Sequence, residues 1–262
     1  MIFFRIVKFL KYILLSHHRK GHGIHSPFVY DLVSRVFMNK IDPAIVFAVE
    51  KVRKKMISDK RIILIKDLGF RSGSLKKNLR RVSEIAKYSP VPRKYGELLS
   101  NMAAEFGKPL IIELGTSLGI STMYMAASSA DTTVWTIEGC PEIAEIARQN
   151  FIETEFDNIR ILEGPFDEVL QSFSTTGSKP GLVFIDGHHR KEPVMNYFNK
   201  IAELSDSKTV IIIDDINYSK EMAEAWDEIK LNRKVKMSID ILRMGILFFR
   251  EGINHNDYII RY

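Results

Sequence analysis

The sequence has a single cysteine, Cys140, among its 262 residues. One cysteine cannot form an internal disulfide, and it rules out a zinc module built on several cysteines. The apolar stretch at residues 1–15 is too short and too charged for a membrane-spanning helix, which needs about 20 apolar residues. The phosphate-binding motif GxxxxGK[ST] is absent, which excludes a P-loop nucleotide site. These absences favour an intracellular globular protein, and we expect a cytoplasmic location.

The charge is unevenly distributed along the chain. Residues 1–96 hold 22 Lys and Arg against 6 Asp and Glu, a net charge of +16, whereas residues 97–262 carry a net charge of −10. A basic first part favours contact with an anionic surface, and the acidic remainder favours a domain whose carboxylates have specific partners. The alternative is that the basic side chains only solvate helix faces.

Residues 1–15 predict an amphipathic helix. At 100° per residue, Arg5, Lys8 and Lys11 fall within one 120° arc, and bulky apolar side chains surround the rest. This pattern is typical of a helix lying on an anionic membrane, here the inner membrane face. A helix that packs on the protein body or on a second subunit, as in a homodimer, fits equally well.

From residue 108 onward, short apolar strands alternate with helices. Helices are expected at 120–130, 141–153, 165–173 and 192–204, and strands at 109–115, 133–139, 158–164, 181–187 and 209–215. This alternation predicts a doubly wound α/β fold with a mostly parallel, seven-stranded sheet. Residues 235–242, 244–250 and 257–262 have no helix between them, so we expect antiparallel edge strands there. We predict a basic, mainly helical extension at 1–84 and the α/β domain at 85–262.

The turn after the first strand, residues 113–122, predicts a cofactor site. Ligands of such sheets bind where the strands end, and Gly115 and Gly119 let the backbone turn sharply there. A dinucleotide site would read GxGxxG, whereas Gly115 and Gly119 have the spacing GxxxG and follow a glutamate. Because the carboxylate of Glu113 would repel phosphate, it favours a ligand with an ammonium group and no phosphates. Glu138, at the end of the second strand, is placed to accept hydrogen bonds from a ribose diol.

The strings IIELGTSLGIST, VWTIEG, ILEGPFD, LVFIDGHH and VIIIDDI resemble, in this order, the class I S-adenosylmethionine-dependent methyltransferases. The likeness is greatest to the small-molecule O-methyltransferase branch, which carries a DGxH element. It implies transfer of a methyl group to a hydroxyl of a small molecule or of a glycan- or lipid-linked acceptor, which stays unidentified. The cofactor-binding residues that it implies are Glu113, Gly115, Thr116, Ser117, Gly119, Ser121, Glu138, Gly139, Gly164, Pro165, Phe166 and Asp186.

Some members of this branch hold a divalent cation, and Asp186, Asp214 and Asp215 match their ligand positions. Mg²⁺ or another hard cation would neutralise three crowded carboxylates and lower the pKa of a bound hydroxyl. Two alternatives stay open: Asp186 binds the cofactor's amino group, or Asp214 caps the next helix.

The DGHH element follows the fourth strand and supplies candidate catalytic residues. We predict catalytic roles for Asp186 and for His188, whose imidazole has a pKa suited to a general base. Asn217, Tyr218 and Lys220 are expected to line the acceptor pocket.

Two other functions are considered. The basic first part of the chain suits a nucleic-acid methyltransferase. However, enzymes of that kind that methylate amino groups usually resemble one another in an Asn/Asp-Pro-Pro-aromatic element after the fourth strand. This chain has DGHH there, so nucleic acid is disfavoured. A non-catalytic cofactor-binding protein is the other alternative.

Overall fold

The computed structural model describes residues 2–17, 23–65, 78–173, 179–252 and 255–262. Contacts within the chain divide it into two compact units, which are described separately: unit 1 comprises residues 1–39 and 178–262, and unit 2 comprises residues 40–177. This division follows packing, so the predicted start of the catalytic domain at residue 85 stays a prediction.

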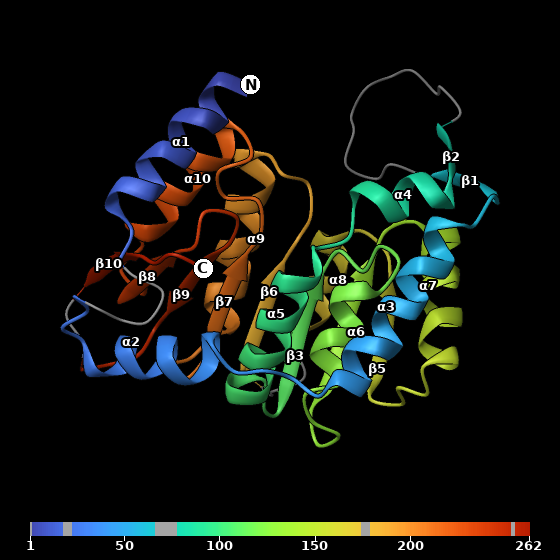
Figure 1. The fold of residues 1–262 in the computed structure, drawn as a ribbon, viewed down its shortest axis with the longest axis horizontal. Coiled ribbons are helices and arrows are strands. Elements are labelled where there is room, and N and C mark those ends of the chain that lie inside the picture. Colours follow the sequence, from blue (N-terminus) through green and yellow to red (C-terminus); the bar gives the residue numbers. More distant parts are fainter. Residues whose placement is uncertain (1, 18–22, 66–77, 174–178, 253–254) are drawn as a thin grey trace. The chain divides into compact units, whose positions relative to one another are not determined.

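Unit 2 contains three parallel strands in the order β3-β4-β5 (Figure 1). The strands are β3 (Leu110–Leu114), β4 (Thr133–Glu138) and β5 (Ile159–Glu163), and the helices between and after them are α6 (Ile120–Ala126), α7 (Pro141–Glu153) and α8 (Phe166–Phe173). All five residues of β3 are buried, as expected for a strand of a covered parallel sheet. The predicted boundaries of α7 and the predicted positions of the strands are confirmed.

The remaining elements of unit 2 precede these strands. They are α3 (Pro43–Ile57), β1 (Ile62–Ile65), β2 (Asn78–Arg81), α4 (Val82–Tyr88) and α5 (Arg93–Phe106). Asp42 caps α3 by accepting a hydrogen bond from the Ala44 amide at 2.8 Å. β1 and β2 pair as an antiparallel ladder, which the prediction of a mainly helical extension did not include. Val49 and Met56 of α3 share one apolar core with Leu118 and Phe151.

Unit 1 contains five strands in the order β10-β8-β9-β7-β6 (Figure 1). They are β6 (Leu182–Ile185), β7 (Val210–Ile213), β8 (Met237–Asp240), β9 (Gly245–Phe248) and β10 (Asn256–Ile259). β6 and β7 are parallel, and β9 is antiparallel to both β7 and β8. β10 lies parallel to β8, so the prediction that the last strand is antiparallel is wrong. Besides the β1-β2 pair, unit 1 contributes five strands and unit 2 contributes three, which makes eight in the described ranges where seven were predicted.

The helices of unit 1 come from the start of the chain and from residues 191–230. They are α1 (Ile2–Leu15), α2 (Pro27–Asp31) with the π-helical segment η1 (Leu32–Phe37), α9 (Lys191–Leu204) and α10 (Lys220–Lys230). Ser219 caps α10 by accepting a hydrogen bond from the Met222 amide at 3.1 Å. The Tyr12 hydroxyl of α1 donates to the Ile260 carbonyl at 2.8 Å and accepts from the Tyr262 amide at 2.7 Å. These bonds fasten α1 to the end of the chain.

Candidate functional site

The turn after β3 has a backbone conformation that ordinary residues avoid. Gly115, Ser117 and Gly119 have φ values of 106°, 48° and 81°. A Cβ atom on Gly119 would lie 2.3 Å from Cε1 of Phe151, far inside contact distance. The turn therefore requires glycine at position 119 for both its conformation and its close packing.

Glu138 at the end of β4 fastens this turn. Its Oε2 accepts a hydrogen bond from the Ser117 amide at 2.9 Å, and its Oε1 accepts one from the Cys140 amide at 3.0 Å. Burial raises the pKa of Glu138 above its ordinary value, and these backbone hydrogen bonds oppose the rise. Each carboxylate oxygen keeps a lone pair, so Glu138 can still accept hydrogen bonds from a ligand.

Glu113, expected to meet an ammonium group, lies in the interior instead. Its side chain is completely buried and accepts hydrogen bonds from Ser121 Oγ and Thr136 Oγ1, both at 2.6 Å, and from the Thr122 hydroxyl. Burial raises the pKa of Glu113 to about 7, against the effect of the three hydroxyl donors. We therefore correct the expected role: Glu113 holds β3, β4 and α6 together.

Two other predicted cofactor residues also face inward. Thr116 is buried, and its hydroxyl lies 2.6 Å from that of Thr136. Ser121 is buried against Glu113. Both hydroxyls therefore form hydrogen bonds within the protein, and neither side chain is placed to contact a cofactor directly.

The predicted residues after β4 and β5 lie together. Glu138 and Glu163 are register partners, and the Gly164 amide donates to the Glu138 carbonyl at 3.0 Å. This places Gly139 beside Gly164, and Pro165 and Phe166 follow at the start of α8. Gly164 has a φ of 142°, so the chain turns there as it leaves β5.

In unit 1, Asp214 is paired with an arginine. Its fully buried carboxylate accepts hydrogen bonds from Arg243 Nε at 2.8 and 3.2 Å and from Nη2 at 2.6 Å. Burial would lower the pKa of Arg243, but the hydrogen bonds and charge of Asp214 raise it above its ordinary value. The sequence signalled nothing about Arg243.

The three predicted metal ligands do not fit a common site. Both oxygens of Asp214 are taken by Arg243, which supplies the positive charge that the prediction gave to a cation. Within the described ranges, no group of three or more His, Cys, Asp or Glu side chains is arranged to hold a metal ion.

His189, and not His188, lies between two of these carboxylates. Its Nε2 lies 3.6 Å from Asp186 Oδ1, and its Nδ1 lies 3.9 Å from Asp215 Oδ2. His188 instead packs edge-on against Tyr197, with ring centroids 5.6 Å apart. His188, His189 and Asp215 all have positive φ values, and such strain in residues other than glycine is frequent at functional sites.

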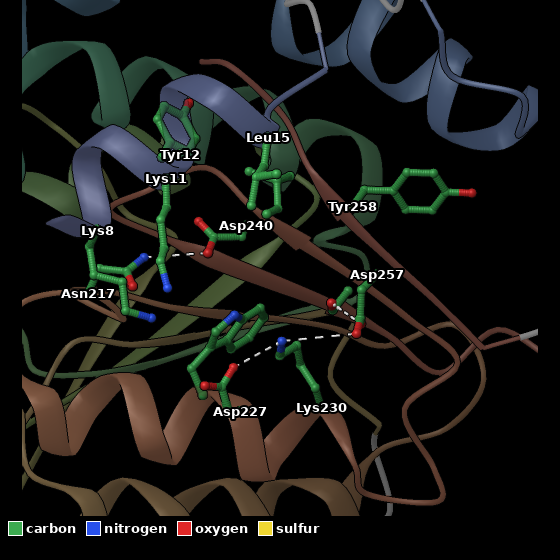
Figure 2. A pocket seen from close by; sticks show the side chains of 13 residues that line it. Lys8, Lys11, Tyr12, Leu15, Asn217, Asp227, Lys230, Asp240, Asp257 and Tyr258 are labelled. Atoms are coloured by element: carbon green, nitrogen blue, oxygen red, sulfur yellow. Dashed lines mark hydrogen bonds and ion pairs between the residues drawn. The ribbon is translucent and has the colours of Figure 1, made fainter.

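Unit 1 has two pockets near its N-terminal helix, and one of them borders this group of residues. One, of about 310 Å³, is lined by Arg5, Asp215, Tyr218 and Arg243 among others, and we call it the Arg243 pocket. The other, of about 240 Å³, lies between α1 and α10, and we call it the α1–α10 pocket (Figure 2). Lys8 and Asn217 line both. Asn217 and Tyr218 thus line a pocket, and that this pocket takes the acceptor stays a prediction, whereas Lys220 is not among the lining residues of either.

α1 presents its apolar side to the exterior of unit 1. The exposed fractions of its apolar side chains reach 77% at Ile2, 79% at Phe3 and 82% at Leu14. Lys8 and Lys11 instead line the α1–α10 pocket. No helix in the described part of the chain is both apolar and long enough to cross a membrane.

Comparison with known proteins supports the class of fold. Residues 112–216 match a family model described as a methyltransferase domain. The O-methyltransferase imqG of Aspergillus flavus is 29% identical over 40% of this chain and 44% of its own length. The catechol O-methyltransferase of Niastella koreensis is 30% identical over 49% and 57%. A tRNA (guanine-N(7)-)-methyltransferase of Corynebacterium glutamicum is 31% identical over 43% and 45%. The chain thus spans about half the length of these curated relatives.

Solved structures extend the likeness over most of the chain. The O-methyltransferase from Bacillus cereus, in complex with SAH, has a TM-score of 0.56 at 20% identity and covers 84% of this chain and 97% of its own. The O-methyltransferase TomG from Streptomyces achromogenes, in complex with SAM, has a TM-score of 0.56 at 18% identity over 85% and 95%. The fold is that of the Rossmann-like class I methyltransferases, with a mostly parallel sheet, antiparallel strands near its C-terminal end and helices at the N-terminal end.

Proposed function

We propose that this chain is an S-adenosylmethionine-dependent methyltransferase that acts on a hydroxyl group of a small molecule. The observation that carries the proposal is the hydrogen bond from the Ser117 amide to Glu138, at 2.9 Å. This hydrogen bond connects the turn after β3, which suits the amino-acid part of the cofactor, with the Glu138 carboxylate, which suits the ribose diol. One structural neighbour is in complex with SAM and another with SAH, which supports the same conclusion.

The residues of unit 2 bind the cofactor in this proposal. Gly115, Ser117 and Gly119 let the turn bring its backbone close to the amino-acid part of the cofactor, Glu138 accepts from the ribose, and Gly164 to Phe166 contact the adenine. Glu113, Thr116 and Ser121 act indirectly, because their side chains hold the turn from inside. When bound, the cofactor supplies an electrophilic methyl group on a sulfonium.

The residues of unit 1 prepare the acceptor hydroxyl. His189 is the base, and Asp186 and Asp215 orient its imidazole and stabilise the imidazolium that forms when it takes the hydroxyl proton. The bound cofactor would supply its methyl group to the acceptor oxygen, and His189 would hold the proton of the hydroxyl until water removes it. His189 thus replaces His188 as the proposed catalytic histidine, with Asp186 kept in a supporting role.

A calorimetric titration with S-adenosylmethionine tests the cofactor site. Glu138→Gln removes a charged acceptor, so we expect affinity to fall about tenfold or more, in line with the 1.5–3 kcal/mol typical of such hydrogen bonds. Glu163→Gln is the matched control, because Glu163 ends the neighbouring strand and is paired with Arg148 at 2.7 Å. Equal affinity in the wild type and Glu138→Gln would overturn the assignment of the site.

Transfer of a labelled methyl group then tests the activity. The full chain is incubated with the labelled cofactor and either small hydroxylated aromatics or tRNA, because one relative is named as a tRNA methyltransferase. Label in the small molecules supports the proposal. Label only in tRNA would favour the nucleic-acid methyltransferase. If the protein binds the cofactor but no label reaches the small molecules, the tRNA or a cell extract, the non-catalytic cofactor-binding protein is favoured.

A further inference from the structure

The α1–α10 pocket brings charged groups of three elements together (Figure 2). Lys8 and Lys11 come from α1, Lys230 and the buried Trp226 come from α10, and Asp240 ends β8. With a volume of about 240 Å³, the pocket has room for part of a small organic molecule.

The helix that supplies two of these lysines is held in place. Tyr12, one turn from Lys8, is buried and bonded to the backbone of Ile260 and Tyr262. The His17 amide, just after α1, donates to the Ile259 carbonyl at 2.7 Å. The ammonium groups of α1 are therefore presented to the pocket by a fixed element.

The carboxylates of the pocket already have partners. Lys230 lies 3.1 Å from Asp227 and 4.0 Å from Asp257, and Asp257 also accepts from Ser238 at 2.5 Å. Asp240 accepts from the Leu242 amide at 2.7 Å and from Asn217 Nδ2 at 3.4 Å. Figure 2 shows these interactions as dashed lines where both partners line the pocket.

Lys8 and Lys11 are different, because neither forms an ion pair within 4.0 Å in the part of the chain that the structure describes. The acids of the pocket are paired or hydrogen-bonded with Lys230, Ser238 and Asn217, and the charge of Lys8 acts on Asp240 only from beyond ion-pair distance, opposing the rise of its pKa that burial causes. The pocket therefore offers two ammonium groups to an incoming anion.

Asn217 supplies an independent sign of a ligand. It is 9% exposed, and its Oδ1 is buried without a hydrogen-bond partner among the described residues, while its Nδ2 is engaged. An unpaired buried acceptor costs about 1–3 kcal/mol, which a ligand donor would recover. Asn217 and Lys8 line both pockets, so the two pockets adjoin at these residues. A molecule bound beside Asp215 in the Arg243 pocket can therefore extend to Lys8 and Lys11.

We propose that the two pockets bind the methyl acceptor and that this acceptor carries an anionic group, held by Lys8 and Lys11. A hydroxyl or amine of the same molecule donates to Asn217 Oδ1, and its apolar part lies against Trp226 and Leu15. The reacting hydroxyl lies toward Asp215 and His189, and in this respect the inference rests on the proposed function. The helix at the start of the chain thereby becomes a specificity element.

Two probes that differ in one charge test the inference. Binding of 3,4-dihydroxybenzoate and of its neutral isostere 3,4-dihydroxybenzamide to the full chain is followed by calorimetry and by tryptophan fluorescence. We expect the acid to bind several-fold more tightly at low salt, and we expect that preference to shrink as salt screens the lysines. In the double variant Lys8→Gln/Lys11→Gln the preference should disappear, with binding of the amide unchanged.

Lys220→Gln is the matched control, because it removes a lysine of unit 1 that lines neither pocket and is 82% exposed. It should keep the preference for the acid, and circular dichroism should show that every variant is folded. Equal binding of the two probes by the wild type, no saturable binding of the acid in the millimolar range, or a preference that survives the double variant would each overturn the inference.

A separate measurement distinguishes failure of the proposed function. Cofactor binding and methyl transfer are measured on the same proteins. If the wild type binds no S-adenosylmethionine, the proposed function fails, whereas a lysine-dependent preference for the acid would still establish the anion site. If cofactor binding is intact and the preference is absent, only the inference about the acceptor fails.

Discussion

Arg243 donates hydrogen bonds to both oxygens of the Asp214 carboxylate, across 29 residues of sequence. The Asp214 side chain is completely buried and that of Arg243 is 25% exposed. A buried carboxylate needs a partner, and because Arg243 is that partner, Asp214 has a structural role at the end of β7. Asp214 stabilises the strand end, and Asp215 is left beside His189.

Arg243→Met should destabilise the protein by about 3–5 kcal/mol, because it leaves a buried charge unpaired. Urea unfolding measures the change, and the double variant Asp214→Asn/Arg243→Met should recover much of it. The control is Arg35→Met, which breaks an exposed pair with Asp31 and should cost less than about 1 kcal/mol. Similar losses in the two single variants would contradict this account.

The pKa of Glu113, raised to about 7 by burial, makes stability depend on pH. A carboxyl with a raised folded-state pKa contributes most below its unfolded value, and the contribution is lost as pH rises toward 7. We expect the free energy of unfolding to fall by about 3 kcal/mol over this range from this group alone. Glu113→Gln should flatten that part of the profile, measured by urea unfolding at a series of pH values. A variant profile parallel to that of the wild type would refute the assignment.

Gly119→Ala should be much more destabilising than Gly252→Ala. Both residues have nearly the same φ, 81° and 79°, so both variants bear a similar backbone strain of about 1 kcal/mol. Only at Gly119 does the new Cβ meet Phe151; at Gly252 nothing lies within 4 Å. The difference in thermal stability isolates the clash, expected at about 1–3 kcal/mol. Equal losses would show that Phe151 moves aside freely.

His189→Asn should lower kcat by about a hundredfold or more, because it removes the proposed base. His188→Asn, whose ring packs against Tyr197, should have a much smaller effect on kcat at saturating acceptor. Unchanged cofactor affinity in both variants is the control for folding. The reverse order of effects would return the catalytic role to His188.

The exposed apolar side of α1 is expected to bind an anionic membrane. Replacing Phe3, Leu10 and Leu14 by Ser removes exposed apolar surface and leaves Lys8 and Lys11 in place. We expect the full chain to float with anionic vesicles at low salt and the triple variant to stay in solution. A change in molecular mass without vesicle binding would instead identify this side of α1 as a homodimer contact.

The sequence alone determined the order and kind of most elements in the α/β part of the chain. Helix α7 was predicted with the boundaries that the structure has, because periodicity and Pro141 at its start are local signals. The turn after β3 was also predictable, since Gly115 and Gly119 are needed for its backbone whatever surrounds it. These features depend on residues a few positions apart.

Only the tertiary structure decided which partner each charged group has. Glu113 turned inward to Ser121, Thr122 and Thr136, and Asp214 paired with Arg243, because burial and long-range contacts determine where a carboxylate points. The parallel direction of β10 was likewise undetermined, since strand periodicity is the same in both directions. Lys8 and Lys11 share one arc of α1 because of their spacing along the chain, whereas the docking of Tyr12 decided that this arc faces a pocket.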